Sequence, residues 1–184
     1  MILSDGEIWE ALERGEIIID PFPNDIALKA IQPSSIDLRL HGLLRKQSRE
    51  QIRGVTVYPP DLNVNDFIQR YTVPEDINGG REFRLEPGNF VIAKTLERIT
   101  LPLTIAGRVE GKSSLARLGI AVHITAPKID PGFSNNITLE IFNLGPFTVA
   151  LRAGMSICVL ILERLGRQAK QGYSGQFQTP ASND

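Results

Sequence analysis

Apolar and polar residues along this 184-residue chain alternate mostly with a period of two, and a helical period is clear only at the N-terminus. There Ile8, Ala11 and Leu12 recur at the spacing of one helix face. Ser4 and Glu7 have the three-residue spacing of a capping box, and Gly15 follows as a stop signal. The pattern therefore predicts one short N-terminal helix.

Most of the remaining chain reads as short strands separated by Pro and Gly turns. In residues 32–41 the apolar positions 36, 38 and 40 alternate with polar ones, and residues 54–58 and 90–95 indicate further strands. The uninterrupted apolar run 155–162 is typical of a strand buried on both faces. Together these runs predict a mainly β fold, as a sandwich, jelly roll or barrel.

Two stretches depart from the strand pattern. Residues 47–81 turn polar and contain Pro59-Pro60 and Gly79-Gly80, which indicates a long excursion. The tail after Gly166 is rich in Gly, Gln and Ser, a composition typical of disorder. We predict one domain over residues 1–166 and a tail over 167–184, and the sequence assigns no role to residues 43–80.

Charge and cysteine content narrow the class of protein. Twenty basic residues against twenty-one acidic ones give a net charge of −1, so nothing in the bulk charge favours nucleic acid or a membrane as partner. The single cysteine, Cys158, excludes an intramolecular disulfide. No apolar run approaches the ~20 residues of a membrane span, and the N-terminus lacks a signal-peptide pattern. We expect a soluble cytoplasmic protein with no nucleic-acid or membrane partner.

The unusual polar residues are concentrated in residues 108–143. Lys112, Ser113, Ser114 and Arg117 lie between two glycines, and such donors suit an anion. Their Gly-Lys-Ser start resembles a Walker phosphate loop, but Ala106 occupies the position where that motif needs glycine, and no α/β unit surrounds it. The residue types leave two readings open: a polyphosphate cradle or a solvated turn.

Two carboxylates follow this cluster. Asp130 begins an Asp-Pro-Gly turn, where an aspartate often only caps the turn. Glu140 lies in a strand pattern whose apolar set is at 137, 139 and 141, so it shares the opposite face with Thr138. Such a glutamate is either solvated or, beside a basic cluster, a general base whose pKa Arg117 shapes.

The histidine and cysteine content limits metal chemistry. His123 stands between Val122 and Ile124, a position more typical of a structural histidine in an apolar strand. Zinc-dependent base deaminases use a His-x-Glu and a Pro-Cys-x-x-Cys pair, and this chain has two His and one Cys in total. A deaminase built within this chain would therefore work without zinc.

The run EGKSSLARLGIAVHITAPKIDPGFSNNITLEIFN resembles the signature of the dCTP deaminase family, a branch of the trimeric dUTPase-like superfamily. LSDGEIWEALERGEIII, IQPSSIDLRL, PGNFVIAKTLERITLP and LRAGMSICVLILERL resemble its N-terminal helix and its other strands. The likeness extends over nearly the whole chain except residues 43–80. It implies a distorted dUTPase-like β jelly roll that forms a homotrimer with active sites shared between subunits.

The resemblance also implies roles for individual residues. The catalytic residues would be Glu140, Arg117 and Ser113. The substrate-binding residues would be Lys112, Ser113, Ser114, Leu115, Ala116, Arg117, Ala126, Asp130, Thr138, Leu139, Glu140, Tyr173 and Gln176. Lys112 to Arg117 would hold the phosphates and frame the base, Asp130 the 3′-hydroxyl, and Thr138 to Glu140 the cytosine edge.

In the family's reaction, water attacks C4 of cytosine, Glu140 carries a proton from the water toward the base, and ammonia leaves. Ser113 and the carbonyl of Ala126 would orient that water, and Arg117 would support Glu140. No zinc takes part, and Mg²⁺ would come with the triphosphate. The product, dUTP, belongs to pyrimidine deoxynucleotide (dUMP and dTTP) biosynthesis, and inhibition by dTTP is left open.

Three positions depart from the family pattern: Lys112 replaces an arginine, Val159 a glutamine, and the tail matches only at Tyr173 and Gln176. A lysine offers a point charge where an arginine offers a fork. The tail would be an abbreviated lid over the triphosphate. Beside dCTP deaminase, the alternatives are a bifunctional dUMP-forming enzyme, a plain dUTPase and a non-catalytic nucleotide-binding module.

Overall fold

The computed structural model describes residues 1–22 and 27–175, and strands dominate it. The helices are α1 (Asp5–Glu13), α2 (Ala27–Ala30), α3 (Arg49–Ile52), α4 (Val64–Tyr71), α5 (Ser113–Ala116) and the 3₁₀ turn η1 (Pro59–Asp61). The strands are β1 (Ile18–Asp20), β2 (Ile31–Gln32), β3 (Ser35–Arg39), β4 (Leu43–Gln47), β5 (Thr72–Asp76), β6 (Glu82–Leu85), β7 (Phe90–Thr100), β8 (Ile105–Gly111), β9 (Ile120–Ala121), β10 (Lys128–Ile129), β11 (Ser134–Asn143), β12 (Val149–Arg152) and β13 (Ser156–Arg164).

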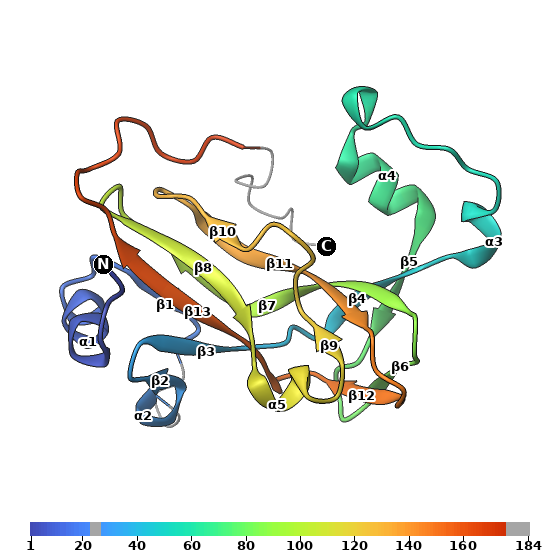
Figure 1. The fold of residues 1–184 in the computed structure, drawn as a ribbon, viewed down its shortest axis with the longest axis horizontal. Coiled ribbons are helices and arrows are strands. Elements are labelled where there is room, and N and C mark those ends of the chain that lie inside the picture. The colour runs from blue at the N-terminus through green and yellow to red at the C-terminus, as the bar shows by residue number, and fades with distance from the viewer. Residues whose placement is uncertain (23–26, 176–184) are drawn as a thin grey trace.

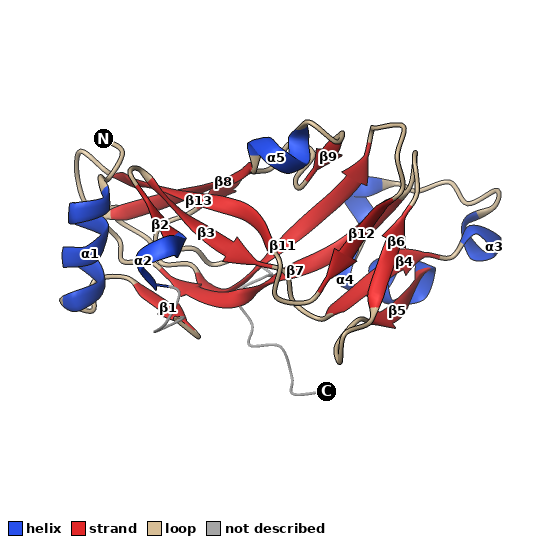
Figure 2. Ribbon diagram, turned by 90° about the horizontal axis from the view of Figure 1, so that it is seen from below, coloured by secondary structure: helices blue, strands red, loops and turns tan. Residues whose placement is uncertain are grey.

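The strands form two main sheets with one apolar core (Figure 1; Figure 2). One sheet has the order β5-β4-β7-β11-β9 with β1 added on β7, and the other has the order β10-β8-β13-β3-β2. A short pair, β12 and β6, completes the fold. Leu38 and Leu160 of the second sheet belong to the same buried cluster as Leu139 and Ile141 of the first. The predicted mainly β sandwich is confirmed.

The predicted N-terminal helix is confirmed as α1. The Ser4 Oγ accepts a hydrogen bond from the Glu7 N–H (3.4 Å), and Glu7 Oε2 accepts one from the Ser4 N–H (2.9 Å). This is the reciprocal capping box. Ile8 and Ala11 are buried, which fixes the helix to the core.

The excursion differs from its prediction in two ways. Residues 54–58 form no strand, and Val55, Val57 and Tyr58 are exposed. Conversely, the sequence pattern predicts only one helix, whereas residues 64–71 form α4. Its N-cap is Asn63, whose side chain accepts from the N–H groups of residues 65 and 66.

β13 and the tail also differ from their predictions. β13 buries alternate residues, with Leu160 and Leu162 inside and Val159 half-buried on the other face, so it is not buried on both faces. The first part of the tail is ordered rather than disordered. The Ala169 N–H donates to the carbonyl of Leu103 (2.9 Å), and the Tyr173 N–H donates to that of Pro131 (2.8 Å).

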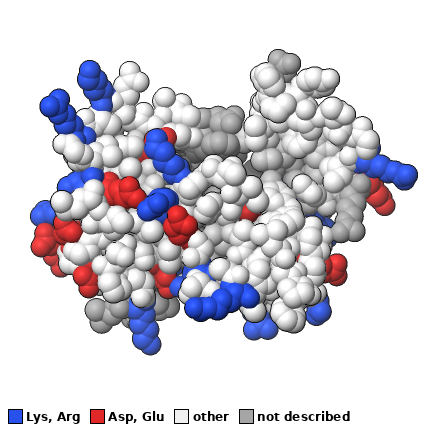
Figure 3. Space-filling view, viewed as in Figure 1, with Lys and Arg blue, Asp and Glu red and all other residues white. Residues whose placement is uncertain are grey.

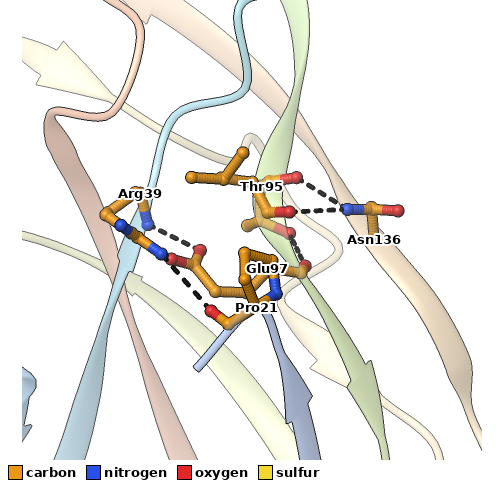
Figure 4. A network of polar contacts seen from close by, with 6 residues as sticks. Pro21, Arg39, Thr95, Glu97 and Asn136 are labelled. Atoms are coloured by element: carbon orange, nitrogen blue, oxygen red, sulfur yellow. Dashed lines mark hydrogen bonds and ion pairs between the residues drawn. The ribbon is translucent and has the colours of Figure 1, made fainter. Parts of the chain in front are cut away.

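A buried polar network links β3, β7 and β11 (Figure 4). Arg39 donates its Nε–H to Glu97 Oε1 (2.6 Å) and its backbone N–H to Glu97 Oε2 (2.8 Å). Asn136 donates to the carbonyl of Thr95 (3.0 Å), and Thr95 and Glu97 are buried. Here β7 carries three residues between Lys94 and Arg98 where β11 carries one, so the network occupies a bulge.

Candidate functional site

The two faces of strand β11 have different environments. Its residues 137, 139 and 141 are buried, while Thr138 and Glu140 on the opposite face are half-buried, as the alternation predicts. Thr138 and Glu140 open into a cavity of about 390 Å³. Its lining residues are Val64, Ile68, Ile92, Val109, His123, Ala126, Lys128, Ile129, Asp130, Phe133, Asn136, Ile137, Thr138, Leu139, Glu140 and Tyr173.

Glu140 is the carboxyl group whose environment is most unusual for its type in this cavity. Burial raises its pKa above the ordinary value, while a hydrogen bond from the Ile124 N–H and the charge interaction with His123 act in the opposite direction. A carboxyl that is partly desolvated in an apolar pocket holds a proton closer to neutral pH than an exposed one does. This is the property that a proton shuttle needs.

Asp130 and Tyr173 of the tail also line this cavity. Asp130 pairs with Lys128 through a contact of 2.7 Å between Nζ and Oδ1. Tyr173 of the tail packs on Phe133, with ring centroids 5.7 Å apart. At Gly132 an added Cβ would lie 2.8 Å from the Cα of Gly172, so this turn and the tail approach each other closely.

The predicted phosphate-binding segment, residues 112–117, lines none of this cavity. It forms α5 and its ends, which lie beside β9, away from β10 and the tail (Figure 1). Lys112 pairs with Asp37 (2.5 Å between Nζ and Oδ2), and Ser113, Ser114 and Arg117 are exposed. Within one chain, Arg117 therefore lies outside the cavity that contains its predicted partner Glu140.

The structure brings together six of the predicted site residues: Ala126, Asp130, Thr138, Leu139, Glu140 and Tyr173. It leaves Lys112, Ser113, Ser114, Leu115, Ala116 and Arg117 outside the cavity. Gln176 lies outside the described residues. The roles assigned to all of these residues stay predictions.

Several lining residues were not predicted as site residues. His123 lies in the loop after β9 rather than in a strand, and its Nε2 is 3.7 Å from Glu110 Oε2. Val64 and Ile68 reach the cavity from α4, which the sequence reading missed. An available signal was the apolar spacing of residues 64, 67, 68 and 71 directly after Asn63, a good N-cap.

Within residues 1–22 and 27–175, no three His, Cys, Asp or Glu side chains gather as metal ligands would. Over the same residues, none of the helices has the length and apolar character needed to cross a membrane. The one cysteine, Cys158, is buried, and burial raises the pKa of its thiol to about 12. It is therefore a structural residue rather than a nucleophile.

Known proteins are similar to this chain in both sequence and fold. The model of the dCTP deaminase-like family matches residues 2–165. The chain belongs to this family.

Among curated members of the dCTP deaminase-like family, a "dCTP deaminase, dUMP-forming" from Methanosphaera stadtmanae is 40% identical over 94% of this chain and 83% of its own length. A "dCTP deaminase" from Rhodospirillum rubrum is 38% identical over 95% of this chain and 88% of its own length. A crystal structure of 2′-deoxycytidine 5′-triphosphate deaminase from Agrobacterium tumefaciens has a TM-score of 0.67 at 24% identity. That likeness covers 88% of this chain and 47% of the other, and it confirms the fold.

Proposed function

We propose that this chain hydrolyses the amino group of dCTP, giving dUTP and ammonia. The observation that supports this most directly is Glu140, a half-buried carboxyl with a raised pKa in an apolar cavity of nucleoside size. The names of the relatives point to the same reaction, because both are called dCTP deaminase.

In the proposed reaction Glu140 takes a proton from the attacking water and gives it to the base. The water oxygen bonds to C4, and its second proton passes through Glu140 to the amino group. The C4–N bond then breaks, so that ammonia leaves and C4 keeps a carbonyl oxygen. Thr138 and Ala126 line the same cavity, where Thr138 would hold the cytosine edge and the Ala126 carbonyl the water, and Asp130 would accept a hydrogen bond from the 3′-hydroxyl. The low dielectric of the cavity strengthens each of these contacts.

We further propose that the chain acts as a homotrimer, with Arg117 and Ser113 of one subunit reaching the Glu140 cavity of the next. The support is the separation of α5 from that cavity within one chain, together with the exposure of the α5 residues. Lys112 would hold phosphate in competition with Asp37. Mg²⁺ would arrive on the triphosphate, which the few cations of this segment cannot neutralise alone. We place the protein in the cytoplasm, where a free buried thiol stays reduced.

The direct test is to incubate the protein with dCTP and Mg²⁺, measure ammonia and identify the nucleotide. We expect ammonia with dUTP as the accumulating product. Ammonia with dUMP would support the second candidate, the bifunctional enzyme, which the name of the Methanosphaera relative, a dUMP-forming dCTP deaminase, favours. If dCTP yields no ammonia while dUTP yields pyrophosphate, the chain is a dUTPase and the proposal is wrong.

Sharing of the site between subunits predicts complementation. Glu140→Gln and Arg117→Ala proteins are each expected to be inactive. After they are unfolded together and refolded at equal concentrations, about a quarter of all sites in the refolded trimers combine both intact residues. Activity should therefore return to about a quarter of the wild-type level, measured as ammonia release. If Glu140 and Arg117 of one chain serve the same site, the mixture will stay inactive.

A further inference from the structure

Helix α4 has an apolar face that is only half-buried in the described part of the chain. Val64, Phe67, Ile68 and Tyr71 are spaced to lie on one side of the helix. Yet none of the residues of α4 is buried. A helix of eight residues depends on tertiary packing for its stability. The apolar face therefore keeps solvent-exposed area that a ligand could cover.

Part of this face borders the proposed nucleotide site. Val64 and Ile68 line the same cavity as Glu140. Ile92 of β7, which also lines it, is the cross-strand partner of Glu140, so the two side chains stand next to each other on one face of the sheet. Arg45 of β4 is paired with Ile92 on the other side.

A second cavity adjoins the first and shares residues with it. It has a volume of about 350 Å³ and is lined by Ile68 and Ile92 together with Phe67, Tyr71 and other residues of the excursion and of β7. Ile68 and Ile92 thus border both cavities, and this places Ile68 at the end of the nucleotide site where Glu140 lies. Figure 3 shows that the surface around α4 carries few charged side chains in this view.

From these contacts we infer that α4 is the apolar wall of the nucleotide site. Val64 and Ile68 pack against the bound pyrimidine deoxynucleoside at the Glu140 end and contribute to its affinity. The inference rests on the proposed function, and it gives residues 43–80 a role in substrate binding. Closely packed protein interiors contain few voids that would let a helix move. The second cavity, which Ile68 borders, gives α4 such space to adjust to the ligand.

The inference predicts a selective loss of affinity in Ile68→Ala and Val64→Ala. Alanine preserves the helix, so the change removes contact area only. We expect the KM for dCTP to rise roughly tenfold in Ile68→Ala, with kcat changed less than about twofold, as for loss of an apolar contact made equally in the ground and transition states. The conservative variant Ile68→Val should keep the KM for dCTP within about threefold of the wild-type value. The measurement is steady-state ammonia release with Mg²⁺ and increasing dCTP.

Two variants on the same helix serve as controls. Gln69 is exposed, and Gln69→Ala should leave KM unchanged. Phe67 lines the second cavity but not the nucleotide cavity, so Phe67→Ala should raise KM far less than Ile68→Ala does. An equal rise in Phe67→Ala would mean that the effect comes from general packing of the helix, and it would overturn the inference.

Wild-type protein in the same assay separates the two proposals. If the wild type releases ammonia from dCTP and Ile68→Ala has an unchanged KM, this inference is overturned and the proposed function stands. If the wild type releases none, the proposed function fails and the inference fails with it. Thermal unfolding of each variant at one protein concentration shows whether the fold is intact, and Gln69→Ala gives the reference melting temperature.

Discussion

Replacing Glu140 by glutamine is expected to lower the rate of ammonia release from dCTP by at least about 10²-fold, and up to about 10⁴-fold, while dCTP still binds. Glutamine has nearly the same shape and can hydrogen-bond, but it cannot take a proton from water and pass it on. Single-turnover ammonia release measures the chemical step, and calorimetric titration with dCTP and Mg²⁺ measures binding. Glu86→Gln, at an exposed turn outside the cavity, is the matched control. A Glu140→Gln protein that deaminates at the wild-type rate would contradict the mechanism.

The same variant also has a predicted effect on stability. Because burial raises the pKa of Glu140 above its ordinary value of 4.5, the folded protein binds this proton more tightly than the unfolded chain. The resulting stabilisation is fully present below pH 4.5 and is lost as the pH rises through the folded-state pKa. Glu140→Gln should therefore be more stable than wild type at neutral pH, and the difference should shrink on acidification. Urea unfolding at a series of pH values measures it.

Replacing Glu97 by alanine is expected to lower the free energy of unfolding by about 3–5 kcal/mol. Glu97 is 2% exposed and accepts two hydrogen bonds from Arg39, so its removal leaves a largely buried guanidinium without its carboxylate. For a chain of this length the melting temperature should fall by roughly 2–4 °C for each kcal/mol. Urea and thermal unfolding at one protein concentration measure the loss.

The matched control for Glu97 is Glu82→Ala. Glu82 pairs with Arg152 through a 3.1 Å contact at the surface, where an ion pair contributes only about 0–1 kcal/mol. We expect this variant to unfold within about 1 kcal/mol of wild type. Equal losses in the two variants would mean that burial does not set the cost of removing Glu97.

The sequence was sufficient for features set by local spacing. The capping box at Ser4 and the alternation that turns Glu140 away from the core depend on residues a few positions apart, and both are present in the structure. The cavity itself depends on long-range packing. Val64 and Ile68 reach it only because β4 and β5 carry the excursion back beside β7, and no local pattern contains that path.

The tail shows the same limit from the other direction. Its composition is typical of disorder, yet Tyr173 is held because Gly132 and Gly172 let two backbones approach, a contact between segments 40 residues apart. Similarly, nothing in the spacing of Lys112 and Arg117 could show that they lie apart from Glu140 in one chain. The predicted carboxylate was placed in a cavity by its own strand, whereas its predicted cationic partners belong to another part of the surface.

The bulge in β7 has an arithmetic consequence. Three residues on β7 face one on β11, so the bulge adds two residues, an even number, and the strand keeps the same side inward before and after it. Val91 and Ile99 can therefore both point into the core although the bulge lies between them. Deleting a single residue from the bulge would turn the first half of β7 over, so that its two faces change places. Val91 would then stand beside Glu140 in the cavity in place of Ile92, and Ile92 would point into the core. Whether the bulge adds an odd or an even number of residues therefore decides which side chains of β7 face the proposed nucleotide site.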